Sequence, residues 1–181
     1  MKNIDPLRYA LEINPWTPAD DLREATLWRG VIVGAWGSVE TTLKEIALRA
    51  SKTDPYGSID CRIPNSRSEL VSHLRGVLII EGPLCSIRNE IDELLSGYDQ
   101  GANDRNLLAH AHMEVLGNWG ATFKAFHAKR DKQGGDHFVY NRIRKTIGEL
   151  DDMARIATEL SHKAQFIRDR IDEGALLMSI G

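Results

Sequence analysis

The chain has 181 residues, of which 42% are hydrophobic and 27% charged, with a net charge of -3 at pH 7. This length predicts a single domain, 1–181, that buries a core without metals or disulfide bridges. The weak negative charge excludes nonspecific binding to nucleic acid over the whole surface, so any such contact must be local. Cys61 and Cys85 lack metal-ligand spacing and are expected to be buried or incidental thiols, with a lone bridge as the alternative. The N-terminus has no apolar signal core and the longest apolar run, 77–80, is too short to cross a bilayer, so we expect a cytoplasmic protein with no membrane partner.

The first long element is expected to be a helix from about residue 21 to 51, after an irregular, proline-bearing arm over 1–21. Apolar residues recur there mostly at intervals of three and four, which predicts a buried face. The apolar positions are Leu22, Leu27, Val31, Ala35, Val39, Leu43, Ile46 and Leu48. Gly30, Gly34 and Gly37 lie in the same helix, and because each costs about 1 kcal/mol relative to alanine, they predict another helix packed closely against them.

Two further helices are expected before residue 100. Prolines, a glycine and small polar residues over 52–65 predict a loop long enough to be mobile or to cover something. The capping-box pattern in Ser66–Glu69 opens a helix that runs to residue 81, where Gly-Pro breaks or kinks it. A third amphipathic helix is predicted over 84–98 and is closed by two glycines.

The stretch that follows carries Arg105, Asn106 and His110 within six residues. Good N-cap residues before it and apolar residues after it predict a helix over about 104–116, ended by a glycine. Asn106 and His110 are four residues apart and share one helix face, whereas Arg105 lies in the first turn and can curl back. We therefore expect the guanidinium, carboxamide and imidazole groups to converge.

The remaining chain predicts a small β-hairpin insertion over 119–140 and a long amphipathic helix over about 144–173. A hairpin of two strands alone is only marginally stable, so it must pack on the helices. The sequence thus predicts an all-α bundle of four or five helices with one hairpin.

The sequence gives little support for several other kinds of functional site. His110, His112 and Glu114 resemble the start of a metal-binding strand, in which alternate residues share a face. In the predicted helix, side chains two positions apart differ in direction by about 200°, so the two imidazoles cannot easily coordinate one ion. We therefore expect no metal and no cofactor. Glycine-rich nucleotide loops and the Gly-x-Ser-x-Gly motif are absent. A purely structural interpretation of the motif is a capped helix whose start is solvated and whose histidine bonds a core carbonyl.

The combination of Arg105, Asn106 and His110 with a helical bundle resembles the HEPN superfamily. Its signature is an Arg, usually followed by Asn or Asp, with a His four to six residues after the Arg. Glu40 stands in the place of the acid often seen in the first helix, and we take Glu40 and His112 as candidate substrate-binding residues. Members paired with a nucleotidyltransferase antitoxin carry a Tyr two residues after the His, and here that position is His112.

The resemblance implies a homodimer that pairs its motif helices and acts as a metal-independent endoribonuclease in a toxin–antitoxin or defence system. His110 would act as general base on a ribose 2′-hydroxyl, Arg105 would stabilise the phosphorane and Asn106 would orient the His or the phosphate, leaving a 2′,3′-cyclic phosphate. An antitoxin or regulatory protein is a possible partner besides RNA. The rival hypothesis is a non-catalytic module that binds RNA or a nucleotide, or holds a dimer together.

Overall fold

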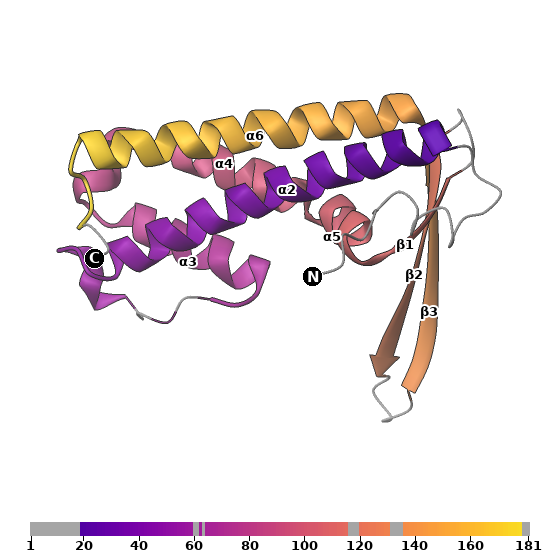
Figure 1. Cartoon of the computed structure of the whole chain (residues 1–181). Helices are drawn as coiled ribbons and strands as arrows, with labels where there is room; N and C mark the ends of the chain where they lie inside the picture. Colours follow the sequence, from indigo (N-terminus) through magenta and orange to yellow (C-terminus); the bar gives the residue numbers. More distant parts are fainter. Residues whose placement is uncertain (1–18, 60–61, 63, 116–119, 131–135, 179–181) are drawn as a thin grey trace, which may run out of the picture. The chain divides into compact units, whose positions relative to one another are not determined.

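The computed structural model describes residues 19–59, 62, 64–115, 120–130 and 136–178 (Figure 1). These residues are mostly helical and include a small antiparallel sheet of three strands. The helices are α2 (Ala19–Ala50), η1 (Tyr56–Ser58), α3 (Arg67–Ile79), η2 (Pro83–Ile87), α4 (Arg88–Gln100), α5 (Ala102–His110) and α6 (Ile147–Glu173), where η marks a 3₁₀ turn. The strands are β1 (His112–Val115), β2 (Ala121–Arg130) and β3 (Asp136–Lys145). The predicted N-terminal arm lies outside the described residues up to residue 18.

The chain packs into two compact units. The first unit, Met1–Val33 with Asn103–Ile156, takes in the start of α2, α5, the sheet and the start of α6. The second unit, Gly34–Ala102 with Ala157–Gly181, takes in the rest of α2 and α6 together with α3 and α4.

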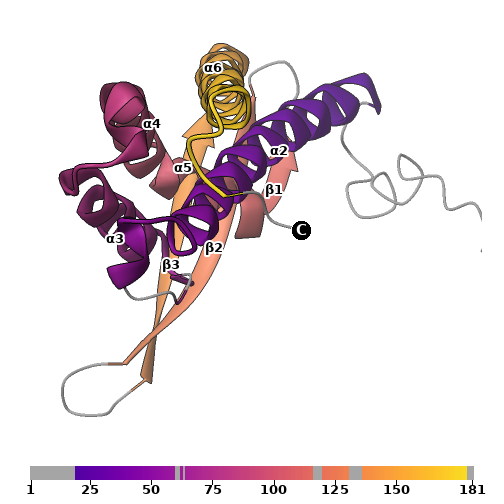
Figure 2. The same ribbon diagram turned by 90° about the vertical axis from the view of Figure 1, so that its left-hand side faces the viewer.

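The second unit is helical, and α3 and α4 lie side by side in it (Figure 2). The predicted capping box opens α3, because the Ser66 hydroxyl accepts from the Glu69 N–H at 3.3 Å and the Glu69 carboxylate accepts from the Ser66 N–H at 3.4 Å. At the same end of this pair, where Arg67 Nη1 donates to the Asp99 carbonyl at 2.8 Å, Gly101 caps α4 and leaves room for the Trp36 ring, which a Cβ there would meet at 2.1 Å. The expected loop after α2 is held in part by Tyr56, which is buried and accepts the Leu84 N–H at 2.8 Å.

The first unit is organised by the sheet, whose order is β1-β2-β3 (Figure 1). Every neighbouring pair is antiparallel, with His112 opposite Lys124 and Lys124 opposite Arg142. Alternate side chains of a strand share a face, and one face carries the buried side chains of Met113, Val115, Ala121, Phe123 and Ala125. Their burial anchors the sheet in the unit.

Two sequence-based boundaries are wrong in this unit. The predicted helix over 104–116 ends at His110, and the chain then turns into β1, whose side chains alternate between exposed and buried. The predicted hairpin over 119–140 is longer, because β3 extends to Lys145 and a third strand pairs with β2. Pairing with β2 satisfies the backbone groups of 112–115 that a helix would otherwise have used.

The buried face of α2 also differs from the expected one. Leu27 is 62% exposed and Val31 is 38% exposed, whereas Ile32 and Trp36 are buried. Gly30, Gly34 and Gly37 have nothing within 4 Å of an added Cβ, so no helix among the described residues packs closely against them. Close packing of a helix from a second copy of the chain on these glycines stays a prediction.

Among the described residues, no single helix is long and apolar enough to cross a membrane. One pair, Arg67–Ile79 with Pro83–Gln100, reaches that length and composition only when the two parts are joined across a bend of 111°.

Candidate functional site

The motif residues lie on α5, a helix of nine residues in the first unit. Asn106 and His110 are exposed, and Arg105 is half-buried. Arg105 Nη1 donates to Asn106 Oδ1 at 3.0 Å, so the guanidinium and the carboxamide are in contact. His110 is the last residue of the helix and stands on the same face as Asn106, one turn later. Asn106 and His110 thus present polar groups to solvent from one short helix, whereas the Nε atom of Arg105 is buried.

The end of α5 is held by Arg29 of α2, within the same unit. Its Nε donates to the Leu108 carbonyl at 2.6 Å, and its Nη2 donates to the carbonyls of Ala109 at 3.3 Å and Ala111 at 3.1 Å. Carbonyls of the last turn have no partner inside a helix, and a cation there also complements the helix dipole. Burial lowers the pKa of the Arg29 guanidinium from its ordinary value. The backbone that carries His110 is therefore fixed by a half-buried side chain about 80 residues away in sequence.

His112, the second candidate histidine, begins β1 and is exposed. His110 ends α5 and His112 begins β1, so the two imidazoles do not belong to one helix, contrary to the prediction. His112 and Glu114 share the exposed face of β1, where the Glu114 carboxylate pairs with Lys124 Nζ at 2.5 Å. Within the part of the chain that the structure describes, no group of three or more His, Cys, Asp or Glu residues is placed to hold a metal ion.

Glu40, the proposed first-helix acid, belongs to the second unit. It is half-buried and forms an ion pair with Lys44 Nζ at 2.7 Å, one turn further along α2. The motif residues belong to the first unit, so a role for Glu40 beside them stays a prediction.

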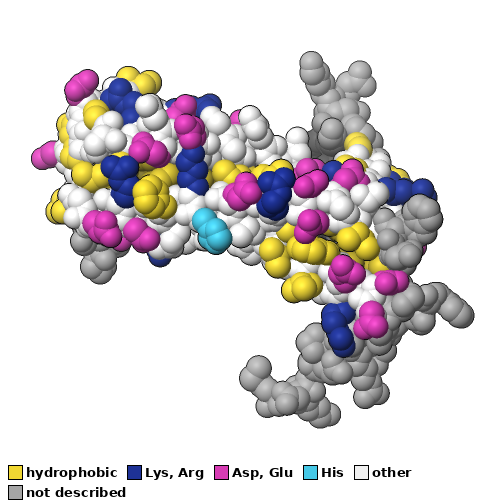
Figure 3. Space-filling model, turned by 90° about the horizontal axis from the view of Figure 1, so that it is seen from above, with side chains coloured by type: hydrophobic (Ala, Val, Ile, Leu, Met, Phe, Trp, Pro, Cys, Tyr) yellow, Lys and Arg dark blue, Asp and Glu magenta, His cyan; other side chains and the backbone are white. Residues whose placement is uncertain are grey.

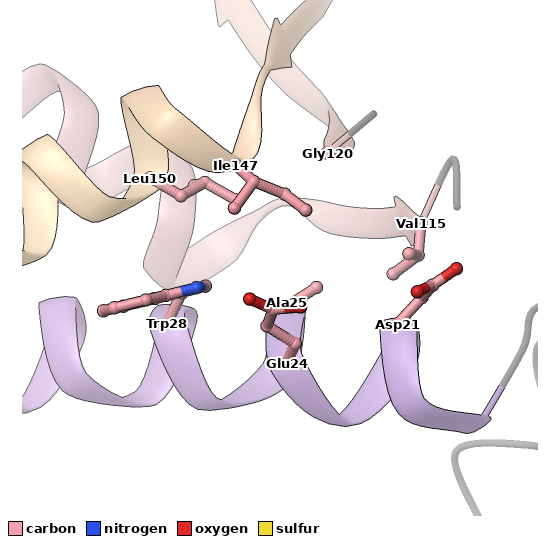
Figure 4. A pocket seen from close by; sticks show the side chains of 8 residues that line it. All are labelled: Asp21, Glu24, Ala25, Trp28, Val115, Gly120, Ile147 and Leu150. Carbon is pink, nitrogen blue, oxygen red and sulfur yellow. The ribbon is translucent and has the colours of Figure 1, made fainter. Parts of the chain in front are cut away.

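A small pocket of the first unit is lined by residues of α2 and α6 together with Val115 of β1 and Gly120 (Figure 4). The figure shows Trp28 of α2 facing Leu150 of α6 across it, with Asp21 near Val115 at the far end. Its volume is about 10 Å³, about the room that one water molecule needs. This pocket is too small for a substrate and includes no motif residue. A wider hollow of about 460 Å³ lies in the second unit beside Arg75 and Arg88 of α3 and α4, and it too lacks the motif.

Sequence reasoning missed Arg29. It lies inside a long helix, and its partners are backbone carbonyls. Backbone acceptors leave no trace in the sequence, so only the folded arrangement identifies this contact.

Comparison of the chain with protein-family models, with curated proteins and with solved structures gave no match in any of the three.

Proposed function

We propose that the protein is a metal-independent endoribonuclease of the HEPN type. The observation that carries this proposal is the accessibility of Asn106 and His110 at the end of a helix that Arg29 holds in place. A structural histidine would be buried against a carbonyl, whereas a catalytic one must be reached by the substrate.

The chemistry follows from the residue types. His110 takes the proton of a ribose 2′-hydroxyl, and the 2′-oxygen attacks the adjacent phosphorus. The bond from phosphorus to the 5′-oxygen breaks, and that oxygen takes a proton from water. Arg105 stabilises the negative charge on the phosphorane, and its contact with Asn106 at 3.0 Å orients the guanidinium. The products are a 2′,3′-cyclic phosphate and a 5′-hydroxyl.

The enzyme acts as a homodimer in this proposal, with an antitoxin or regulatory protein as a further partner. Exposed hydrophobic side chains stand between charged ones on the surface seen in Figure 3. Leu27 and Val31 are large exposed hydrophobic residues of α2. Gly30, beside them on α2, has nothing from the described residues within 4 Å of an added Cβ, which leaves space for a second copy to approach closely. Two-fold dimers, in which both copies use the same surface patch, are the commonest oligomers.

Replacing Leu27 by Asp should convert the dimer to a monomer, because a charge would be buried in the apolar contact. Sedimentation velocity at micromolar concentration measures the change. Ile79→Asp is the matched control, since Ile79 is 80% exposed on α3 and should stay dimeric after substitution. A wild-type protein that sediments as a monomer would contradict the dimer.

Activity is tested with the full chain, a panel of single-stranded and hairpin RNAs, and an excess of EDTA. We expect cleavage of at least one RNA and no loss of rate on chelation. A wild-type protein that binds RNA but cleaves no member of the panel would favour the rival hypothesis of a non-catalytic binding module.

A further inference from the structure

Positive charge is concentrated in the hairpin that follows the motif. Residues 121–145 contain seven Lys and Arg residues against two Asp residues, although the whole chain has a net charge of -3. A local basic segment on an acidic chain is the pattern expected when one surface has an anionic partner.

The sheet register places three of these cations on one face together with His112. His112, Lys124 and Arg142 are directly opposite one another across β1, β2 and β3, so their side chains share a face. Arg144 lies two residues along β3 from Arg142 and is on the same face. We call these four residues the basic face. His112, Arg142 and Arg144 are exposed and Lys124 is half-buried.

The basic face carries more positive charges than nearby carboxylates neutralise. Glu114 pairs with Lys124 at 2.5 Å, whereas Arg142 and Arg144 form no salt bridge with any residue that the structure describes. The hydrogen bond and charge of Lys124, and then the charges of Arg142 and His112, lower the pKa of the Glu114 carboxyl. One carboxylate thus lies in the field of several cations. Like charges directly opposite on a sheet, as Lys124 and Arg142 are, cost stability, and a bound anion would remove that cost.

An aromatic ring accompanies the charges. Tyr140 lies two residues before Arg142 on β3, on the same face, and is 48% exposed. Exposed aromatic rings beside cations are how proteins bind single-stranded nucleic acid, because each base stacks on a ring while its phosphate meets a cation. A lipid surface or an acidic peptide would need no such ring.

We propose that the basic face and Tyr140 bind single-stranded RNA and deliver it to the motif on α5. The identity of the ligand as RNA rests on the proposed function, but binding itself does not depend on cleavage. Ala111 alone separates His110 from His112 at the edge of the basic face. A strand bound across the face therefore leads to the imidazole of His110.

The test measures binding without cleavage. The probe is a fluorescein-labelled single-stranded RNA of about 12 nucleotides. Anisotropy titrations are made in EDTA with His110→Ala protein, at several salt concentrations. The variant adds Arg142→Gln and Arg144→Gln, and the matched control instead adds Arg23→Gln and Arg155→Gln. The control changes the same charge on two exposed arginines of the same unit, which lie on α2 and α6 and not on the strands.

We expect the Arg142→Gln/Arg144→Gln protein to bind the RNA about tenfold more weakly or worse at low salt. The slope of log affinity against log salt should fall by about 1.4, since each lost phosphate contact contributes about 0.7. Tyr140→Ala should weaken binding by at least about fivefold, whereas Tyr140→Phe should restore it because the ring remains.

Three results would overturn the proposal. The first is equal loss of affinity in the Arg23→Gln/Arg155→Gln control. The second is binding of phosphatidylserine vesicles as tight as that of the RNA. The third is no RNA binding by the His110→Ala protein. Normal RNA binding through the basic face without cleavage by the wild type would instead support this proposal while refuting the nuclease.

Discussion

Substitution of His110 or Arg105 by Ala should abolish RNA cleavage while leaving the fold in place. Loss of a general base costs about 10² to 10⁴ in rate, and loss of a group that stabilises the phosphorane costs about 10² to 10³. His110 is exposed, so its truncation should change the free energy of unfolding by no more than about 0.5 kcal/mol. Arg105 is half-buried and bonded to Asn106, so Arg105→Ala should cost about 1 kcal/mol.

The double variant Arg105→Ala/His110→Ala separates catalysis from structure. Residues that act on one transition state fail as a unit, so the double variant should cleave no more slowly than the slower single variant. The histidine control is His162→Ala, since His162 is an exposed residue of α6. Cleavage rates in EDTA and urea unfolding curves of the wild type and all four variants give the comparison. Large losses of stability in both single variants, with no cleavage by the parent, would leave the motif a structural role only.

Replacing Arg29 by Met should destabilise the first unit more than any change of an exposed residue does. The change removes three hydrogen bonds to the carbonyls of Leu108, Ala109 and Ala111, while methionine still fills the space of the aliphatic stem. Hydrogen bonds from a charged donor contribute about 1.5 to 3 kcal/mol, so we expect a loss of about 2 to 3 kcal/mol in urea unfolding. Cleavage should fall as well, because the end of α5 that carries His110 is no longer held.

The matched control is Arg23→Met, six residues earlier on α2. Arg23 has a 68% exposed side chain and a 3.9 Å ion pair with Asp20, which predicts a change of no more than about 0.5 kcal/mol. Equal stability of the Arg29→Met and Arg23→Met proteins would show that the carbonyl contacts do not hold α5.

The sequence was most informative where structure is local. The capping box at Ser66 and Glu69 marks the start of α3, and the predicted limits of the first helix, 21–51, lie within two residues of Ala19–Ala50. Capping and helical periodicity depend on residues within one or two turns, so a single sequence contains them. The mostly helical character with a small antiparallel element follows from the same signals.

Predictions from the sequence were wrong where residues far apart in the chain determine the local structure. Ala111 and Val115 fit a helical stripe with Leu107 and Leu108, yet pairing with β2 draws 112–115 into a strand. The apolar and polar residues of 112–115 alternate over only four positions, which is too short a pattern to distinguish a strand from that helical stripe. Similarly, Leu27 and Val31 match the helix period but face away from the core, since periodicity shows that a face is apolar and not what covers it. The last helix is predicted to start at about residue 144, whereas β3 extends to Lys145 and α6 begins at Ile147.

The candidate site shows the same division. Its residue types and the helix that carries Arg105 and Asn106 could be predicted, because they lie within six positions. Its setting could not, because Arg29 acts through backbone carbonyls 79 to 82 residues away and Lys124 comes from another strand.

The central claim is that His110 activates a ribose 2′-hydroxyl, and a substrate that lacks this group tests it most directly. Once a cleaved RNA is found, the same RNA is prepared with a single 2′-deoxy nucleotide on the 5′ side of the cleaved bond. In EDTA, we predict that the unmodified RNA ends in a 2′,3′-cyclic phosphate and that the 2′-deoxy RNA stays intact. Cleavage of the 2′-deoxy RNA at the same bond, or products that carry a 5′-phosphate, would contradict the account.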